Sequence, residues 1–372
     1  MNSLRLFAML SVAGAIAAGT SGCTRSVYVP ANPSATPVAK PSATPVATPS
    51  ATPVVTPTAT PTPAAGTLYV ADYGDDAIHV FPAAGNGNIA PSFSLSVANG
   101  IASPKGMTFD ALGTLYVTNS TGSSSGDVVY FKAPVTSAST GQTITYANFY
   151  DPVDVAVDPS GSIYVLDLEG QGFESSNTGP VTPSIFVFSP GASGPSVPIR
   201  TISGSATSVN SLSSSLAVDA TTIYVGTIDF AAVYEFPSNA NGNVTPSTLE
   251  GSATGLGDSD AVRVDSAGQL VVRSEPCPTN SCVTEVSRFN AGATGNTPPT
   301  SSIETYSVAN GGDNAIGECL DTQADVYLPH IGGNDPQQVG FFPVSDSGTV
   351  SPSATIAGPN TQLNGPDYCA VH

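Results

Sequence analysis

Gly66-Thr-Leu-Tyr-Val-Ala-Asp72 is a short apolar stretch bounded by turn-forming residues, and versions of it return through most of the 372-residue chain. Its Leu-Tyr-Val core recurs five times, as Leu115-Tyr-Val117, Ile163-Tyr-Val165, Ile223-Tyr-Val225, Leu270-Val-Val272 and Val326-Tyr-Leu328. Counted from Tyr69, the central residues follow one another by 47, 48, 60, 47 and 56 residues. Apolar and polar residues alternate around each copy without a helical period. The sequence therefore predicts an all-β chain built from repeats of this length.

Each repeat can be extended to four short strands. The strand before the Tyr-Val strand ends in an acid and a tight turn, as in Val155-Ala-Val-Asp158 followed by Pro-Ser-Gly161. A third apolar strand follows at 185–188 and a fourth, less regular one at 199–202. Four short strands per repeat at this spacing are typical of a β-propeller blade.

The repeat that begins at Gly66 lacks a first strand of its own. Cys369-Ala-Val-His372, at the other end of the chain, matches the other first strands and places His372 where they have Asp. The sequence therefore predicts a six-bladed β-propeller of four-stranded blades over residues 66–372. Its ring is closed by pairing of the C-terminal strand with the N-terminal blade.

Two of the repeats also resemble a known family. Leu68-Tyr-Val-Ala-Asp72 and Leu115-Tyr-Val-Thr-Asn119 are similar to the NHL and YVTN repeats of bacterial propellers, and the resemblance covers about 300 residues. It implies the fold. Its members include surface-layer and adhesive proteins, lyases, and calcium-dependent hydrolases of the gluconolactonase and regucalcin type, so it implies no single activity.

The N-terminus has the features of an export signal. Residues 1–22 contain Arg5, an apolar run over 6–18 and small residues at the end, which predicts a cleaved secretory signal. Thr20-Ser-Gly-Cys23 resembles a bacterial lipobox, with Thr20 where Leu is usual. The resemblance implies a lipid on Cys23 that anchors the chain in the cell membrane or outer membrane, outside the cytoplasm. The alternative is an ordinary signal peptide with a chance Cys.

Residues 23–65 repeat Pro, Ser, Ala and Thr, and Pro every few residues prevents helix and sheet. This composition predicts a disordered, extended spacer that holds the folded part away from its anchor.

The net charge of −19 argues against a nucleic-acid partner, since such binding needs clustered Lys and Arg. Residues 1–65 hold three bases and no acid, so residues 66–372 carry 28 acids and 6 bases, a net of −22. This charge either attracts cations and cationic ligands or only keeps the protein soluble. We expect a monomer.

The cysteines test the predicted ring. If Cys23 carries a lipid, four Cys remain, and three pairings are open. Cys277 and Cys282 are close enough to pair locally, while Cys319 and Cys369 lie in first strands of neighbouring blades. We expect the disulfides Cys277–Cys282 and Cys319–Cys369. The alternative for the second pair is two small apolar side chains that fill inner positions.

The same register places Arg263 and Glu318 in opposed positions of neighbouring blades. An unpaired charge near the axis is costly, so an ion pair between them is predicted. It serves either as a structural bridge or as a polar group that lines the channel.

The loops that follow the second strands and precede the first strands form the candidate ligand face. Oxygen ligands that converge there from several blades would suit calcium, although the chain has no Asp-x-Asp-x-Asp-Gly loop. The alternative is a polar surface with no ligand. The candidate residues are Asp72, Asn119, Asp167, Asp229, Glu275, His330 and Asp335.

The sequence shows no catalytic set, no phosphate loop and no zinc pattern. We therefore expect a binding or structural module that takes a protein, glycan or small-molecule ligand on the loop face. A calcium-dependent hydrolase or lyase of the gluconolactonase-like type is the alternative.

Overall fold

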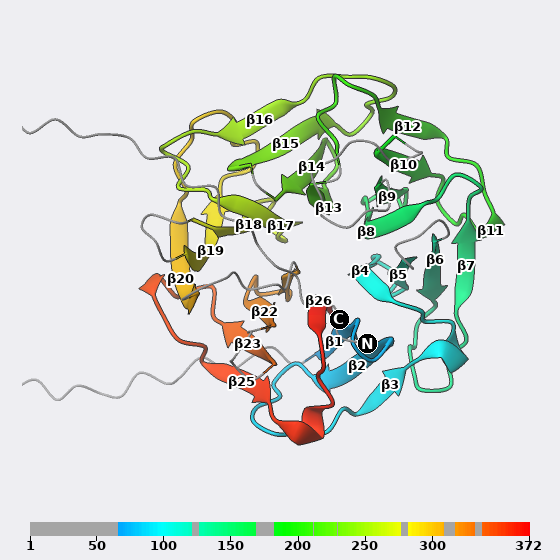
Figure 1. Cartoon of the computed structure of the whole chain (residues 1–372), viewed down its shortest axis with the longest axis vertical. Helices are drawn as coiled ribbons and strands as arrows, with labels where there is room; N and C mark the ends of the chain where they lie inside the picture. The colour runs from blue at the N-terminus through cyan, green and yellow to red at the C-terminus, as the bar shows by residue number, and fades with distance from the viewer. Residues whose placement is uncertain are drawn as a thin grey trace, which may run out of the picture. The chain divides into compact units, whose positions relative to one another are not determined.

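The computed structural model describes residues 66–120, 126–168, 182–210, 212–228, 230–276, 282–308, 317–331 and 337–372. Within these ranges the fold is a β-propeller of four-stranded antiparallel units arranged around a common axis (Figure 1). No helix in the described ranges has the length and apolar character needed to cross a membrane.

The strands have the roles that the repeat predicts. Each unit pairs its strands in the order first, second, third and fourth, and the first strand lies nearest the axis (Figure 1). The first strands are β4 (Pro104–Phe109), β8 (Asp151–Val157), β13 (Ser213–Val218), β17 (Asp258–Val264), β21 (Cys319–Leu320) and β26 (Pro366–Val371). The second strands, which carry the Tyr-Val motif, are β1 (Thr67–Asp72), β5 (Leu115–Ser120), β9 (Ile163–Leu168), β14 (Thr222–Thr227), β18 (Leu270–Glu275) and β22 (Val326–His330).

The third and fourth strands complete each unit towards the outside. The third strands are β2 (Ala77–Pro82), β6 (Gly126–Phe131), β10 (Ser184–Phe188), β15 (Ala232–Pro237), β19 (Cys282–Phe289) and β23 (Gln338–Phe342). The fourth strands are β3 (Phe93–Leu95), β7 (Gln142–Thr145), β12 (Arg200–Ser203), β16 (Ser247–Glu250), β20 (Ser301–Val308) and β25 (Ala354–Ala357). Two-residue strands, β11 (Gly194–Pro195) and β24 (Gly348–Thr349), and two short 3-10 helices, η1 (Val97–Asn99) and η2 (Pro359–Thr361), lie in the connections.

The chain ends close the ring as predicted. β26 pairs with β1 in antiparallel register, and Thr67 and His372 exchange two backbone hydrogen bonds of 2.7 and 3.0 Å. Cys319 on β21 and Cys369 on β26 form the expected disulfide, with their Cα atoms 5.4 Å apart. Closure therefore combines the β26–β1 strand ladder (Figure 1) with a covalent link to the preceding unit.

The Asp that ends a first strand and the Tyr of the second strand form one recurring contact. Asp158 accepts backbone hydrogen bonds from Ser160 and Ser162, and its other oxygen accepts the Tyr164 hydroxyl at 3.1 Å. The same Asp–Tyr pair recurs at Asp110–Tyr116, Asp219–Tyr224 and Asp321–Tyr327. The repeat keeps both residues because one carboxylate fixes the hairpin turn and satisfies a buried phenol.

Where the Tyr is missing, a different side chain serves the carboxylate. β18 has Val271 at the Tyr position, and the guanidinium of Arg288 on β19 lies 3.7 Å from Asp265 instead. The degenerate repeat therefore keeps a polar partner for its Asp.

The outer edges are covered by loops that reach back to the preceding unit. Gly242, with φ +80°, lies between β15 and β16 and bridges Ile202 on β12 of the unit before. Asn243 beside it accepts the Ala206 N–H at 2.7 Å. Equivalent bridges occur at Gly87–Ile356 and Leu249–Gly295. These contacts satisfy backbone groups that an exposed edge strand would leave unpaired.

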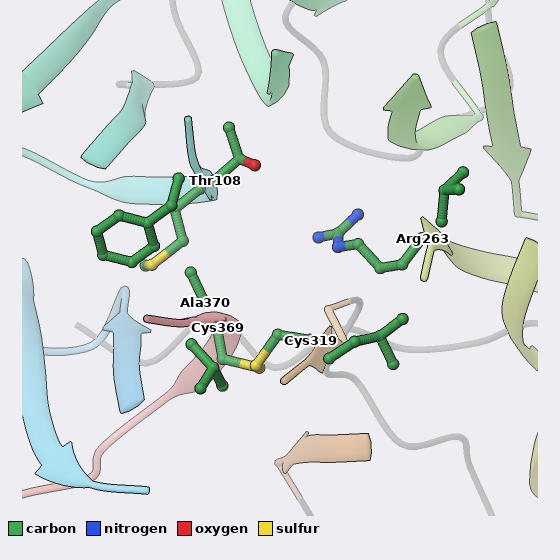
Figure 2. A pocket seen from close by; sticks show the side chains of 10 residues that line it. Thr108, Arg263, Cys319, Cys369 and Ala370 are labelled. Carbon is green, nitrogen blue, oxygen red and sulfur yellow. A yellow bond between two sulfur atoms is a disulfide. The ribbon is translucent and has the colours of Figure 1, made fainter. Parts of the chain in front are cut away.

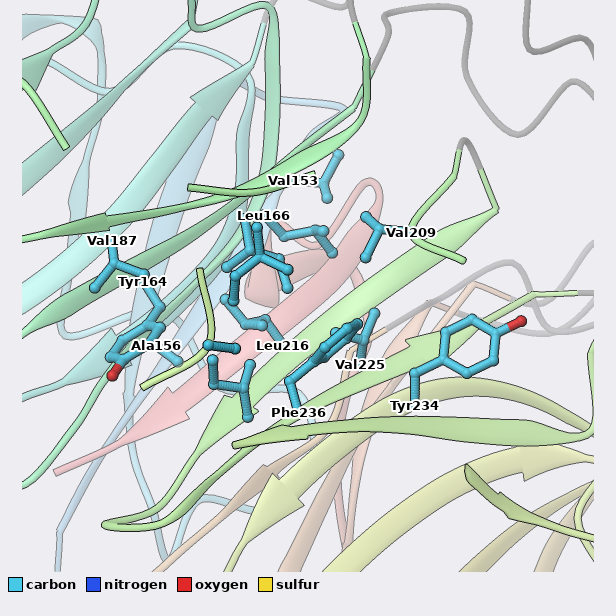
Figure 3. Close-up of a cluster of buried hydrophobic side chains, with 14 of the residues drawn as sticks. Val153, Ala156, Tyr164, Leu166, Val187, Val209, Leu216, Val225, Tyr234 and Phe236 are labelled. Carbon is cyan, nitrogen blue, oxygen red and sulfur yellow. The ribbon is translucent and has the colours of Figure 1, made fainter. Parts of the chain in front are cut away.

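Apolar side chains fill the space between neighbouring units. In the cluster of Figure 3, Leu166 from β9 lies with Leu216, Val225 and Phe236 from β13, β14 and β15 of the next unit, and all four are at most 1% exposed. Alternating residues of each strand face opposite neighbours, so both faces of a blade are buried. This explains why the second strands read as nearly continuous apolar runs.

Candidate functional site

Asp72 and Asn119, which occupy the same position at the ends of β1 and β5, act as caps on the loop face. Asp72 accepts the Asn364 N–H at 2.6 Å, and Asn119 accepts the Ala102 N–H at 3.0 Å. Asn364 and Ala102 both lie just before the first strand of the same unit. The repeated side chain therefore holds the incoming chain in place.

Asp167 has the same role at the end of β9. It accepts the N–H groups of Tyr150 and Asp151, the latter at 2.9 Å, and is 2% exposed. Burial raises the pKa of Asp167 to about 7, although its two backbone donors act in the opposite direction. Asp151 in turn accepts the Lys105 ammonium at 3.1 Å and the Ser120 hydroxyl. The carboxylates of Asp167 and Asp151 therefore already have hydrogen-bond or ion-pair partners within the protein.

Of the remaining candidates of the loop face, Glu275 and His330 lie in the described part of the chain. Glu275 lies 3.3 Å from the guanidinium of Arg273, and His330 is 4% exposed at the end of β22. Asp229 and Asp335 lie outside the described residues, as do Cys23 and Cys277, the expected partner of Cys282. Within the described ranges, no group of three or more His, Cys, Asp or Glu is placed to hold a metal ion.

Arg263 has a different partner from the one predicted. Its Nη1 donates to Asp154 at 3.3 Å and to the Val262 carbonyl at 2.8 Å, so the predicted Arg263–Glu318 ion pair is wrong. Asp154 lies on β8 and also accepts the Leu216 N–H of β13 at 2.8 Å. Because the first strands converge on the axis, the long Arg263 side chain reaches past β13 to the strand beyond it.

Glu318 does not form an ion pair with Arg263, although the Arg263 charge acts on it. Its side chain is fully buried, and neither carboxyl oxygen has a hydrogen-bond partner among the described residues. Burial raises the pKa of Glu318 to about 7, although the positive charges of Arg263, Arg273 and Arg288 act to lower it. Glu318 is therefore protonated more readily than an exposed Glu, whose pKa is about 4.3.

Tyr368 blocks the channel. It is 1% exposed, and its hydroxyl donates to the Ser214 carbonyl at 3.0 Å. Its strand β26 and the strand β13 of Ser214 lie on opposite sides of the axis (Figure 1), so the side chain crosses the centre. The sequence carried a signal that was missed. Four residues before the closing Asp or His, the first strands have Gly106, Asp154, Ser215, Ala261, Gly317 and Tyr368, of which one is large.

Asp154 also lies four residues before a closing Asp, and its side chain explains why the neighbouring first strand has Gly106 at the equivalent position. A Cβ atom on Gly106 would lie 2.0 Å from the Asp154 carboxylate, so the neighbouring strand tolerates only glycine there. Tyr368 and Asp154 therefore fill the channel on the side of the loop face.

An open cavity remains at the other end of the channel, towards the carboxyl ends of the first strands. Its volume is about 200 Å3, and Figure 2 shows Arg263 and Thr108 directed into it above the Cys319–Cys369 disulfide. This cavity is the concave feature that the sequence did not predict.

Comparison with known proteins supports the fold but no specific function. No family model and no curated protein matches the chain. Among solved structures, a functionally unknown protein from Desulfotomaculum acetoxidans is 9% identical, with 83% of this chain and 99% of that chain covered and a TM-score of 0.50. A Xanthomonas campestris gluconolactonase is 16% identical over 72% of this chain and 79% of that chain, with a TM-score of 0.46.

An aldose sugar dehydrogenase from Streptomyces coelicolor in its PQQ-bound form is 12% identical. The match covers 83% of this chain and 90% of that chain, with a TM-score of 0.47. The chain is thus a β-propeller with distant structural similarity to these proteins, and identity this low carries no activity across.

Proposed function

We propose that this chain is an exported, membrane-anchored propeller that acts as a binding or structural module. The observation that carries the proposal is the use of the strand-end side chains. Asp72, Asn119 and Asp167 hydrogen-bond to backbone groups of their own units, at 2.6 to 3.1 Å. Side chains that hold loops in this way stabilise the loop conformation and already have partners within the protein. This arrangement suits a rigid binding surface better than a reaction centre.

We further propose that the ring has six blades. The support is the one-to-one match between repeat and sheet: each Tyr-Val strand pairs with its own first and third strands. The repeat that begins at Gly66 obtains its first strand from β26, and no repeat is left over.

The anchor is proposed at Cys23, with residues 23–65 as the spacer. The small residues before Cys23 and the Pro-rich composition after it support the proposal. A Cys23→Ser variant should leave the membrane fraction and appear in the soluble extracytoplasmic fraction. If this variant stayed in the membrane fraction, the lipid anchor would be refuted.

Binding and catalysis are separated by experiments on the mature full-length chain. Calorimetry with calcium and a screen of lactone hydrolysis should give neither stoichiometric binding nor turnover. Calcium-dependent turnover would establish the gluconolactonase-like alternative and overturn the module.

The binding role itself is tested by probing a glycan array and extracted envelope proteins with the mature chain. A Tyr73→Ala variant is the useful comparison, because Tyr73 is 57% exposed next to Asp72 on the loop face. We expect Tyr73→Ala to weaken binding to the partner that the array or the extract identifies. Leu112→Ala, in the hairpin between β4 and β5, should leave this binding unchanged. If Leu112→Ala weakened it as much as Tyr73→Ala, the loop face would not be the binding surface.

A further inference from the structure

The cavity at the carboxyl ends of the first strands has one charged side chain in its lining. It has two lobes of about 200 and 230 Å3, which share Met107, Thr108, Phe109, Arg263 and Val264. At about 30 Å3 per water molecule, each lobe has room for roughly seven waters. The other lining residues are uncharged. A lone cation in the cavity is unusual for a region with a net charge of −22.

The cavity exists because of one repeated position. Two residues before its closing Asp or His, each first strand contributes a side chain to the lining. Five of these side chains are short and leave the centre open, while the sixth is Arg263. The short ones are Thr108, Ala156, Ala217, Cys319 and Ala370. Figure 2 shows the Arg263 guanidinium directed into the cavity, with the Thr108 hydroxyl on the far side.

The guanidinium of Arg263 is only partly used by the protein. Nη1 serves Asp154 and the Val262 carbonyl, whereas Nη2 is buried with no hydrogen-bond partner among the described residues. A buried donor without an acceptor is costly, so a small shift of the Arg263 side chain that brings Nη2 to an acceptor in the cavity would be favourable. A carboxylate matches the planar donor geometry of arginine.

We propose that this cavity binds a small organic carboxylate, with Arg263 as the charged anchor and Thr108 as a second donor. The short apolar lining, including Ala156 and Ala217, takes the alkyl part of the ligand. The site goes beyond the proposed function, because it lies at the opposite end of the channel from the loop face. It does not depend on the anchor.

The test uses the mature full-length protein and butyrate, with butyramide as the uncharged ligand of equal size. Calorimetry should show one saturable butyrate site, at least about tenfold tighter than butyramide, as expected for hydrogen bonds to a charged group. Arg263→Lys keeps a cation beside Asp154 but loses the planar pair of guanidinium donors. It should weaken butyrate binding at least about tenfold. Lys132→Met removes an exposed cation outside the cavity and should leave binding unchanged.

Two further variants keep the test independent of the Arg263–Asp154 pair. Thr108→Val should weaken butyrate about two- to tenfold, the range for one hydrogen bond. Ala217→Leu should fill one lobe and abolish binding. The proposal is overturned if butyrate binds no better than butyramide, or if folded Arg263→Lys and Thr108→Val both bind butyrate like the parent protein.

Discussion

The Cys319–Cys369 disulfide gives the sharpest quantitative test of the closed ring. The two residues are 50 positions apart, and the bond joins β26, the last strand in the sequence, to the preceding unit. In the chain-entropy model, a closed loop of this length stabilises the folded state by about 4 kcal/mol. Cys319→Ala/Cys369→Ala should lower the unfolding free energy by roughly that amount. The same model gives about 2 kcal/mol for the short loop predicted between Cys277 and Cys282, which makes Cys277→Ala/Cys282→Ala the matched control.

Guanidinium unfolding followed by far-ultraviolet circular dichroism measures both differences, and hydrogen exchange locates them. The chain has no Trp, so tyrosine emission is the available fluorescence probe. Loss of the longer loop should speed exchange of the Thr67 and His372 amides, which join β1 to β26. Reduction of the parent protein should reproduce the destabilisation. An unchanged midpoint in the Cys319→Ala/Cys369→Ala protein, with unchanged exchange at Thr67, would refute the idea that this bond secures the closure.

Three other perturbations test the interior. Removal of residues 363–372 takes away all of β26 and should open the ring, seen as a lower melting temperature and rapid proteolysis; equal stability would contradict closure. Arg263→Met strands the buried Asp154 carboxylate and should cost about 3 kcal/mol, with Arg263→Lys much milder; equal losses in denaturant unfolding would argue against the pair. Burial raises the pKa values of Glu318 and Asp167 to about 7, above their values in the unfolded chain. The stability that these two protonated groups contribute is therefore fully present below about pH 4 and is lost as the pH rises through 7. Glu318→Gln should remove up to about 3 kcal/mol of that loss; an unchanged pH profile would show that Glu318 does not titrate there.

The strand order and the closure could be predicted because they depend on local, repeated signals. Alternation of apolar residues gave the strands, and the Asp before each Tyr-Val strand marked the hairpin. The structure adds the reason for that spacing: Asp158 satisfies the Tyr164 hydroxyl across the turn. Cys369 could be placed because one repeat lacked a first strand.

The contacts across the axis could not be predicted in the same way. Register relates residues on paired strands and on neighbouring blades, but it does not say how far a long side chain extends. Arg263 therefore found Asp154 two units away, and Tyr368 reached Ser214 on the far side. The loop-face acids show a related limit. Asp72 was placed correctly at a strand end, yet only the backbone of Asn364 shows that it caps a loop.

The distribution of basic residues connects the interior to the proposed anchor. Lys105, Arg263, Arg273 and Arg288 lie 3.1 to 3.7 Å from carboxylates inside the propeller. Because only six bases occur in residues 66–372, their use inside leaves an outer surface dominated by acids. A surface of this sign is repelled by the anionic head groups of a membrane. If the proposed lipid anchor at Cys23 and the proposed spacer over residues 23–65 are correct, this repulsion and the spacer would act in the same direction, because each would favour separation of the propeller from the bilayer.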